Sequence, residues 1–216
     1  MISNSSNLLK SAKPFWDEMR RHPFIRGVGS GTISRDIFDF WVAQDYIFVR
    51  EALRFLGALE MRSPDYEISV FLADSFGSLK NELHIFERYA SDRKFSLRVE
   101  PTQICRAYID FLLSIAIQRS FEEAFAALWC AEKGYLDSWS VSKKMAKKDN
   151  PYRVFINNWT SNAFRDYVLW IEKKLNALTN GKSDREMRSI ERIFLETAKY
   201  ECLFWDMAFL GKRDNL

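Results

Sequence analysis

The chain has 216 residues with 47% hydrophobic and 28% charged side chains, the length and composition of an ordinary globular domain. Its 32 basic and 29 acidic residues leave a net charge of only +3 and are spread along the chain, so they do not indicate a nucleic-acid-binding surface. Eight glycines and five prolines are few for a chain with many turns, and they favour long helices with few connections.

The distribution of cysteines and apolar residues excludes several other classes. Cys105, Cys130 and Cys202 are scattered and odd in number, so they form neither a disulfide framework nor a metal-binding motif. No apolar core of a signal peptide opens the chain, and no run of 18 apolar residues could span a membrane. We therefore expect a cytoplasmic protein that makes one domain of residues 1–216 and binds neither membrane nor nucleic acid.

The first part of the chain predicts two helices separated by a turn. The first runs from about residue 7 to residue 21, and it ends before Pro23 because the residue preceding a proline avoids the helical region. A glycine-rich stretch around residues 27–31 then predicts a turn. Ser34 has the character of an N-cap for a long helix over residues 35–62, whose apolar stripe contains one acid, Asp45.

The middle of the chain predicts three more helices. Prolines open the helices over residues 64–91 and 101–118, and a loop joins them. Ser120 caps a helix over residues 121–147, where Glu132 interrupts the apolar stripe.

The last part of the chain predicts a helix pair that ends near residue 178 and a final helix that begins at Ser183. We expect a kink in this pair near Thr160. The final helix has Phe194, Glu201 and Trp205 on one stripe, at helical spacing. No strand is indicated, so the sequence predicts an all-α bundle of about seven or eight helices.

Three carboxylates lie where apolar side chains are expected, namely Asp45, Glu132 and Glu201. A carboxylate that faces a helical core is costly unless it is paired, hydrogen-bonded or protonated, so each is a candidate site residue. Aromatic residues accompany them on the same faces: Phe48, Tyr108, Tyr135, Trp159 and Trp205. Two interpretations stay open, a core filled with aromatics around structural acids and a pocket that stacks a flat ring and moves protons.

A metal site is the competing interpretation for buried acids in a helical bundle. Bundles that hold two iron ions use Glu-x-x-His spacing, and this chain has only His22 and His84. His22 precedes a proline, and Glu82 lies two residues from His84, which is the wrong spacing. We therefore expect no metal and no cofactor, and we interpret His22 as a cap at a helix end.

Four segments together resemble the TenA family, the thiaminase II family related to the fungal Thi-4 proteins. They are HPF at His22, WVAQDY around Asp45, and the later pair FAALWCAEKGYLDSW and YECLFWDMAF. The resemblance extends from about Phe15 to Phe209. It implies a heme-oxygenase-like helical bundle without heme, and metal-independent hydrolysis of aminopyrimidines in thiamin salvage.

The resemblance also implies roles for individual residues. Asp45 matches the acid that bonds the pyrimidine amine and ring nitrogen, and Glu201 matches the acid/base glutamate. The other matching positions form the aromatic wall of the pocket: Phe48, Tyr108, Tyr135 and Trp159, with Trp205 beside them.

One departure from the family pattern concerns the nucleophilic cysteine of its better-studied branch. That position corresponds here to Ala131, and Cys130 lies one residue earlier, which turns it by about 100° on a helix. The chain thus resembles the branch without the cysteine, in which a carboxylate on this helix is kept, and Glu132 fits that role.

The expected activity is therefore hydrolysis of an aminopyrimidine by carboxylate-activated water. The substrate would be 4-amino-5-aminomethyl-2-methylpyrimidine or an N-acyl derivative. Three alternatives are thiamin cleavage by a thiaminase II, a cofactorless oxidase like pyrroloquinoline-quinone synthase, and a non-enzymatic regulator. We also expect a homodimer or homotetramer.

Overall fold

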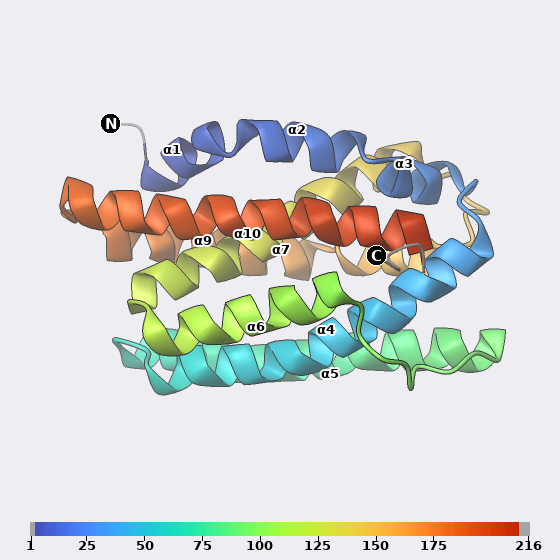
Figure 1. Ribbon diagram of the computed structural model, residues 1–216, viewed down its shortest axis with the longest axis horizontal. Helices are drawn as coiled ribbons and strands as arrows, with labels where there is room; N and C mark the ends of the chain where they lie inside the picture. The colour runs from blue at the N-terminus through green and yellow to red at the C-terminus, as the bar shows by residue number, and fades with distance from the viewer. Residues whose placement is uncertain (1–2, 212–216) are drawn as a thin grey trace. The chain divides into compact units, whose positions relative to one another are not determined.

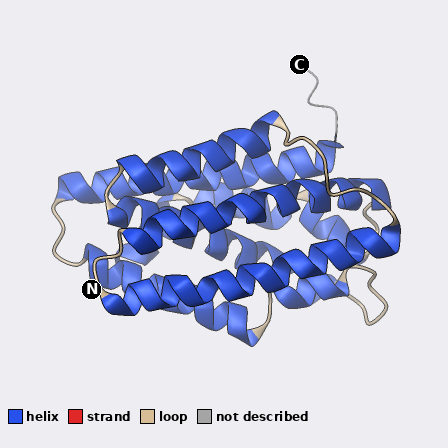
Figure 2. Ribbon diagram, turned by 90° about the horizontal axis from the view of Figure 1, so that it is seen from below, coloured by secondary structure: helices blue, strands red, loops and turns tan. Residues whose placement is uncertain are grey.

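The computed structural model describes residues 3–211, and within this range no strand occurs (Figure 2). The chain forms two compact units. Unit 1 is the described part of Met1–Ile33 together with Glu122–Trp205, and unit 2 is Ser34–Phe121 together with the described part of Asp206–Leu216. The prediction of an all-α architecture is confirmed, whereas the prediction of a single domain stays a prediction.

Unit 2 contains three helices that lie side by side in Figure 1. They are α4 (Arg35–Met61), α5 (Tyr66–Arg93) and α6 (Gln103–Gln118), and α4 packs against both of the others. As predicted, the Ser34 side chain caps α4 by accepting a hydrogen bond from the backbone amide of Ile37. The next two helices begin one residue after Asp65 and Thr102, which cap them in place of the nearby prolines.

Unit 1 contains the remaining helices, apart from the first residue of α7 and the last residues of α10. They are α1 (Asn4–Ser11), α2 (Lys13–Arg21), α3 (Pro23–Ser30), α7 (Phe121–Met145), α8 (Arg153–Asn158), α9 (Asn162–Thr179) and α10 (Asp184–Leu210). The structure thus has more and shorter helices than predicted. The expected first helix is divided at Ala12, while the break near Thr160 separates α8 from α9 as predicted.

The glycine-rich stretch expected to be a turn is in fact mostly helical. The His22 side chain caps α3 by accepting a hydrogen bond from the Phe24 amide, as the sequence predicted, and the helix continues to Ser30. A Cβ atom at Gly29 would lie only 2.8 Å from the Ser142 Cα, so this glycine allows α3 to approach α7 closely. Only Gly31, with φ of 74°, supplies the left-handed turn.

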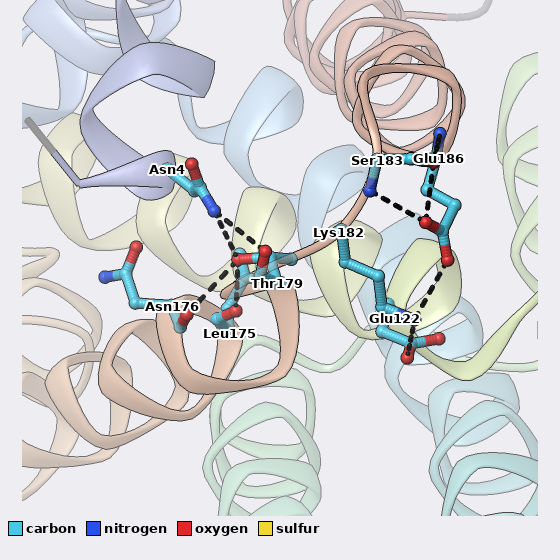
Figure 3. Close-up of polar contacts among 8 residues, drawn as sticks. All are labelled: Asn4, Glu122, Leu175, Asn176, Thr179, Lys182, Ser183 and Glu186. Atoms are coloured by element: carbon cyan, nitrogen blue, oxygen red, sulfur yellow. Dashed lines mark hydrogen bonds and ion pairs between the residues drawn. The ribbon is translucent and has the colours of Figure 1, made fainter.

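The start of α10 shows how side chains fix the ends of helices in unit 1 (Figure 3). Glu186 accepts a hydrogen bond from the Ser183 amide, and the Ser183 hydroxyl accepts one from the Glu186 amide. This reciprocal pair is a capping box, so the prediction that Ser183 starts the last helix is confirmed. Nearby, the Asn4 amide donates to the Thr179 carbonyl oxygen and connects α1 to the end of α9.

No helix among residues 3–211 is both long and apolar enough to cross a bilayer.

Candidate active site

In unit 1, Glu201 of α10 lies against α7. Its side chain is buried, with 1% of its surface exposed. A Cβ atom built on Gly134 of α7 would lie 3.8 Å from the Glu201 Oε2 atom. The carboxylate is also close enough to raise the pKa of the Cys130 thiol, although burial of the thiol is the larger cause. Glu201 therefore faces the side of α7 that carries Cys130 and Gly134, one helical turn apart.

Aromatic rings gather beside this carboxylate. Trp205, one turn after Glu201 on α10, stacks on Tyr135 with ring centroids 5.1 Å apart. Trp159 contacts Tyr135 edge-on at 5.8 Å and stacks on Trp139 at 4.8 Å. Tyr135 thus contacts both Trp159 and Trp205, and Trp139 also contacts both of these tryptophans.

Glu132 occupies a different side of α7 from the Glu201 contact. It is two residues from both Cys130 and Gly134, so its side chain points about 160° away from each of them around the helix. It meets α9, where the Tyr167 hydroxyl donates a hydrogen bond to it at 3.3 Å. Burial raises the pKa of the Glu132 carboxyl to about 7, and the Tyr167 hydrogen bond opposes that rise. The residue as a whole is half-buried, and desolvation of its carboxyl group is the main cause of the raised pKa.

In unit 2, Asp45 of α4 lies at the contact with α6. Its side chain is 1% exposed. Burial raises the pKa of the Cys105 thiol on α6 to about 12, and the negative charge of Asp45 contributes to the rise. Phe48, also on α4, packs against Tyr108 of α6 with ring centroids 4.8 Å apart. Asp45, Phe48 and Tyr108 therefore belong to one contact between α4 and α6.

The environment of Cys130 does not suit a nucleophile. Cys130 is fully buried, and its Sγ donates to the Phe194 carbonyl oxygen at 3.4 Å. Burial is the main reason that its pKa lies well above the ordinary value, so the reactive thiolate is suppressed. Within residues 3–211, no group of three or more His, Cys, Asp or Glu side chains is placed to hold a metal ion.

Two small residues on α7 escaped the sequence prediction. Gly134 approaches the Glu201 carboxylate, and Ser138 follows it by one helical turn with its hydroxyl buried. A glycine inside a long helical pattern is an unfavourable choice that commonly has a packing or functional reason, so Gly134 carried a signal. Ser138 carried none, because a serine in a helix has no distinctive pattern.

Comparisons with known proteins show the family to which the chain is related. The model of the TENA/THI-4/PQQC family matches residues 9–210. An aminopyrimidine aminohydrolase from Helicobacter pylori is 27% identical, with 95% of this chain and 98% of the relative covered. A second, from Halalkalibacterium halodurans, is also 27% identical, with 96% of each chain covered.

Solved structures give the same fold. A TenA homologue from Pyrococcus furiosus has 36% sequence identity and a TM-score of 0.92, covering 95% of this chain and 100% of its own. A domain with a heme-oxygenase-like fold from Shewanella denitrificans has a TM-score of 0.76 at 13% identity, with 97% and 94% covered. The predicted heme-oxygenase-like helical fold is thereby confirmed.

Proposed function

The chain belongs to the TENA/THI-4/PQQC family, and from this premise we propose that it is a hydrolase of aminopyrimidines in thiamin salvage. The observation that carries the proposal is the buried Glu201 carboxylate beside the stacked rings of Tyr135 and Trp205. Such rings can stack a flat heteroaromatic substrate, and a buried carboxylate beside them can move a proton.

The proposed reaction replaces the amine of an aminomethylpyrimidine by a hydroxyl group. Glu201 accepts a proton from water, and the water oxygen bonds to the methylene carbon. The C–N bond breaks, its electron pair leaves with the nitrogen, and the proton is returned to that nitrogen. One water is consumed, and one ammonia and one hydroxymethylpyrimidine are formed.

Asp45 is proposed to hold the pyrimidine through its amine and ring nitrogen, with Phe48 and Tyr108 as ring contacts. This role is supported by the burial of Asp45 and by the packing of Phe48 on Tyr108 in unit 2. A carboxyl group that accepts a hydrogen bond from the ring amine, with one proton held between its second oxygen and the ring nitrogen, selects aminopyrimidines over their oxo analogues, which lack that amine donor.

Glu132 has less support as a helper of Glu201 than the sequence suggested. Its carboxyl group points toward Tyr167 of α9, about 160° around α7 from the residues that Glu201 approaches. We propose that Glu201 acts without it, and that Glu132 affects stability more than turnover.

Cleavage of thiamin is the second candidate function. Whether the Cys130 thiol takes part in the reaction distinguishes it from hydrolysis of an aminomethylpyrimidine. The family branch that cleaves thiamin uses a cysteine nucleophile, whereas Cys130 is buried and bonded to a backbone carbonyl. The test compares turnover of thiamin and of 4-amino-5-aminomethyl-2-methylpyrimidine by the wild type and by Cys130→Ala. We expect ammonia release from the aminomethylpyrimidine, unchanged in the variant. Thiamin cleavage that the variant loses would instead assign the chain to the cysteine branch.

We also propose a homodimer or homotetramer in the cytoplasm. Met61, Tyr66 and Ile117, at the adjoining ends of α4, α5 and α6, are 78%, 84% and 67% exposed, and large exposed apolar side chains favour association. Three free buried thiols suit a reducing compartment. Light scattering at assay concentration tests the assembly, and a monomer would contradict it. Cell fractionation tests the compartment.

A further inference from the structure

Gln44 immediately precedes Asp45 on α4, and only 2% of its surface is exposed. Its side-chain nitrogen donates a hydrogen bond to the Glu100 carbonyl oxygen at 3.1 Å, and its side-chain oxygen accepts one from the Thr102 amide at 2.8 Å. Thr102 is also the N-cap of α6, and its hydroxyl accepts a hydrogen bond from the Cys105 amide. Gln44 therefore attaches α4 to the start of α6 through both ends of its side-chain amide.

Three interactions join α4 to α6 in succession, each three residues further along α6 than the one before. The pairs, with the residue of α4 first, are Gln44 with Thr102, Asp45 with Cys105, and Phe48 with Tyr108. A hydrogen bond restricts both distance and angle, whereas the effect of a charge on a thiol and the packing of two rings tolerate larger displacements. Gln44 is thus the most directional of the three.

A second buried amide, Asn150 in unit 1, is bonded in the same way and serves for comparison. It donates to the Val28 and Gly29 carbonyl oxygens and accepts from the Tyr152 amide. None of these partners is a candidate site residue. Gln44 differs from Asn150 because the two backbone groups that it bonds lead into the helix that packs on Asp45 and Phe48.

We propose that Gln44 is a positioning residue for Asp45. By fixing the start of α6 against α4, it sets where the Asp45 carboxyl group meets a ring that contacts Phe48 and Tyr108. This inference rests on the proposed function and deepens it, because it makes Gln44 a determinant of the selectivity for aminopyrimidines over their oxo analogues. A site that binds a ligand selectively depends on surrounding residues to hold the groups that touch it.

Loss of the Gln44 hydrogen bonds should affect the two classes of pyrimidine differently. The hydrogen bond from the ring amine to Asp45 depends on a narrow range of distance and angle, so a displaced carboxyl group weakens it. Packing of the ring on Phe48 and Tyr108 is less sensitive to the same displacement and is available to both classes. The aminopyrimidine should therefore lose affinity, while the oxo analogue keeps most of its affinity.

The test compares Gln44→Ala with Asn150→Ala as its matched control, since each variant removes one buried side-chain amide that bonds to backbone groups. Isothermal titration calorimetry measures the affinity of each folded protein for 4-amino-5-hydroxymethyl-2-methylpyrimidine and for its 4-oxo analogue. Gln44→Ala should reduce the preference for the amino compound by at least about tenfold, and Asn150→Ala should leave it within about twofold of wild type. In turnover, Gln44→Ala should raise KM at least about fivefold while kcat stays within about twofold. A wild-type preference in Gln44→Ala, or an equal loss in Asn150→Ala, would overturn the proposal.

Gln44→Met is a second variant, which covers the case in which the shorter alanine side chain prevents folding. It keeps the length of the side chain but makes neither hydrogen bond, so it should lose the same preference. If neither variant folds, Gln44 serves the stability of unit 2 alone and the proposal is overturned. A wild type that releases no ammonia from any aminopyrimidine overturns the proposed function itself, whereas an active wild type whose Gln44 variants keep the preference overturns only the role of Gln44. An active wild type without any preference overturns the role of Asp45 and, with it, this inference.

Discussion

Replacement of Glu132 by glutamine should remove a specific part of the pH dependence of stability. The Glu132 carboxyl is desolvated where α7 meets α9, and this burial raises its pKa from 4.5 to about 7. Glutamine keeps the oxygen that accepts the Tyr167 hydrogen bond but cannot ionise. Glu132→Gln therefore isolates the cost of the charge while preserving the shape and the contact.

The sign and size of the Glu132 contribution to the free energy of unfolding follow from proton linkage. Between pH 4.5 and about 7 the folded state holds a proton on Glu132 that the unfolded state has released, so the free energy of unfolding falls as pH rises through this window. The gap between the two pKa values, at about 1.4 kcal/mol for each pH unit, gives a loss of about 3 kcal/mol that is complete slightly above pH 7. Below pH 4.5 the carboxyl is neutral in both states and the effect vanishes.

The assay is urea unfolding followed by circular dichroism at pH 4.5 and pH 8, for wild type and Glu132→Gln. The two proteins share every other titrating group, so the difference between their pH dependences isolates Glu132. We expect the variant to gain stability relative to wild type at pH 8 and little at pH 4.5. Glu186→Gln is the control of opposite sign, measured as the pH falls from 4.5 to about 2, because the hydrogen bond from the Ser183 hydroxyl is the largest of the contacts that lower the Glu186 pKa from 4.5 to about 2. In that window the wild type should lose stability relative to Glu186→Gln as the pH falls. Identical pH dependences for wild type and Glu132→Gln would refute the reasoning.

Three further predictions concern capping, a buried amide and thiol reactivity. Ser183→Ala removes the N-cap of α10 and should lower the free energy of unfolding by about 1 kcal/mol in urea titrations; no change would contradict the capping box. Asn150→Ala removes the hydrogen bonds that its side chain donates to the Val28 and Gly29 carbonyl oxygens and accepts from the Tyr152 amide, so about 2–3 kcal/mol should be lost in the same assay; a loss below about 0.5 kcal/mol would contradict the predicted role of the Asn150 side chain. Cys105, with its pKa raised to about 12 by burial, should resist alkylation at pH 8 until the protein is unfolded, as mass spectrometry would detect, and rapid labelling of the folded protein would refute this.

The sequence predicted the long helices well because their ends carry local signals. Ser34 and Ser183 are N-caps whose side chains act on amides a few residues away, so no tertiary information is needed to read them. The glycine-rich stretch was misread because Gly29 serves a contact distant in the chain. Its missing side chain accommodates α7 at Ser142, and a local pattern cannot distinguish that use from a turn.

In the candidate site, too, the sequence pattern predicted some features, whereas others depend on how the helices pack. The stripe on α10 predicted that Glu201 faces inward, and its burial confirms this. On α7 the apolar periodicity did not predict which helix each side chain contacts, because apolar residues lie on most sides of that helix. The direction of Glu132 toward Tyr167 and the proximity of Gly134 to Glu201 required the packing of the helices.

Ammonia release by wild type and Glu201→Gln most directly tests whether this buried carboxylate carries the reaction. Purified proteins are incubated with 4-amino-5-aminomethyl-2-methylpyrimidine, and ammonia and the hydroxymethyl product are quantified together. We predict equal amounts of the two products from the wild type, and a fall in kcat of at least about a hundredfold in the variant. Undiminished release by Glu201→Gln would contradict the account.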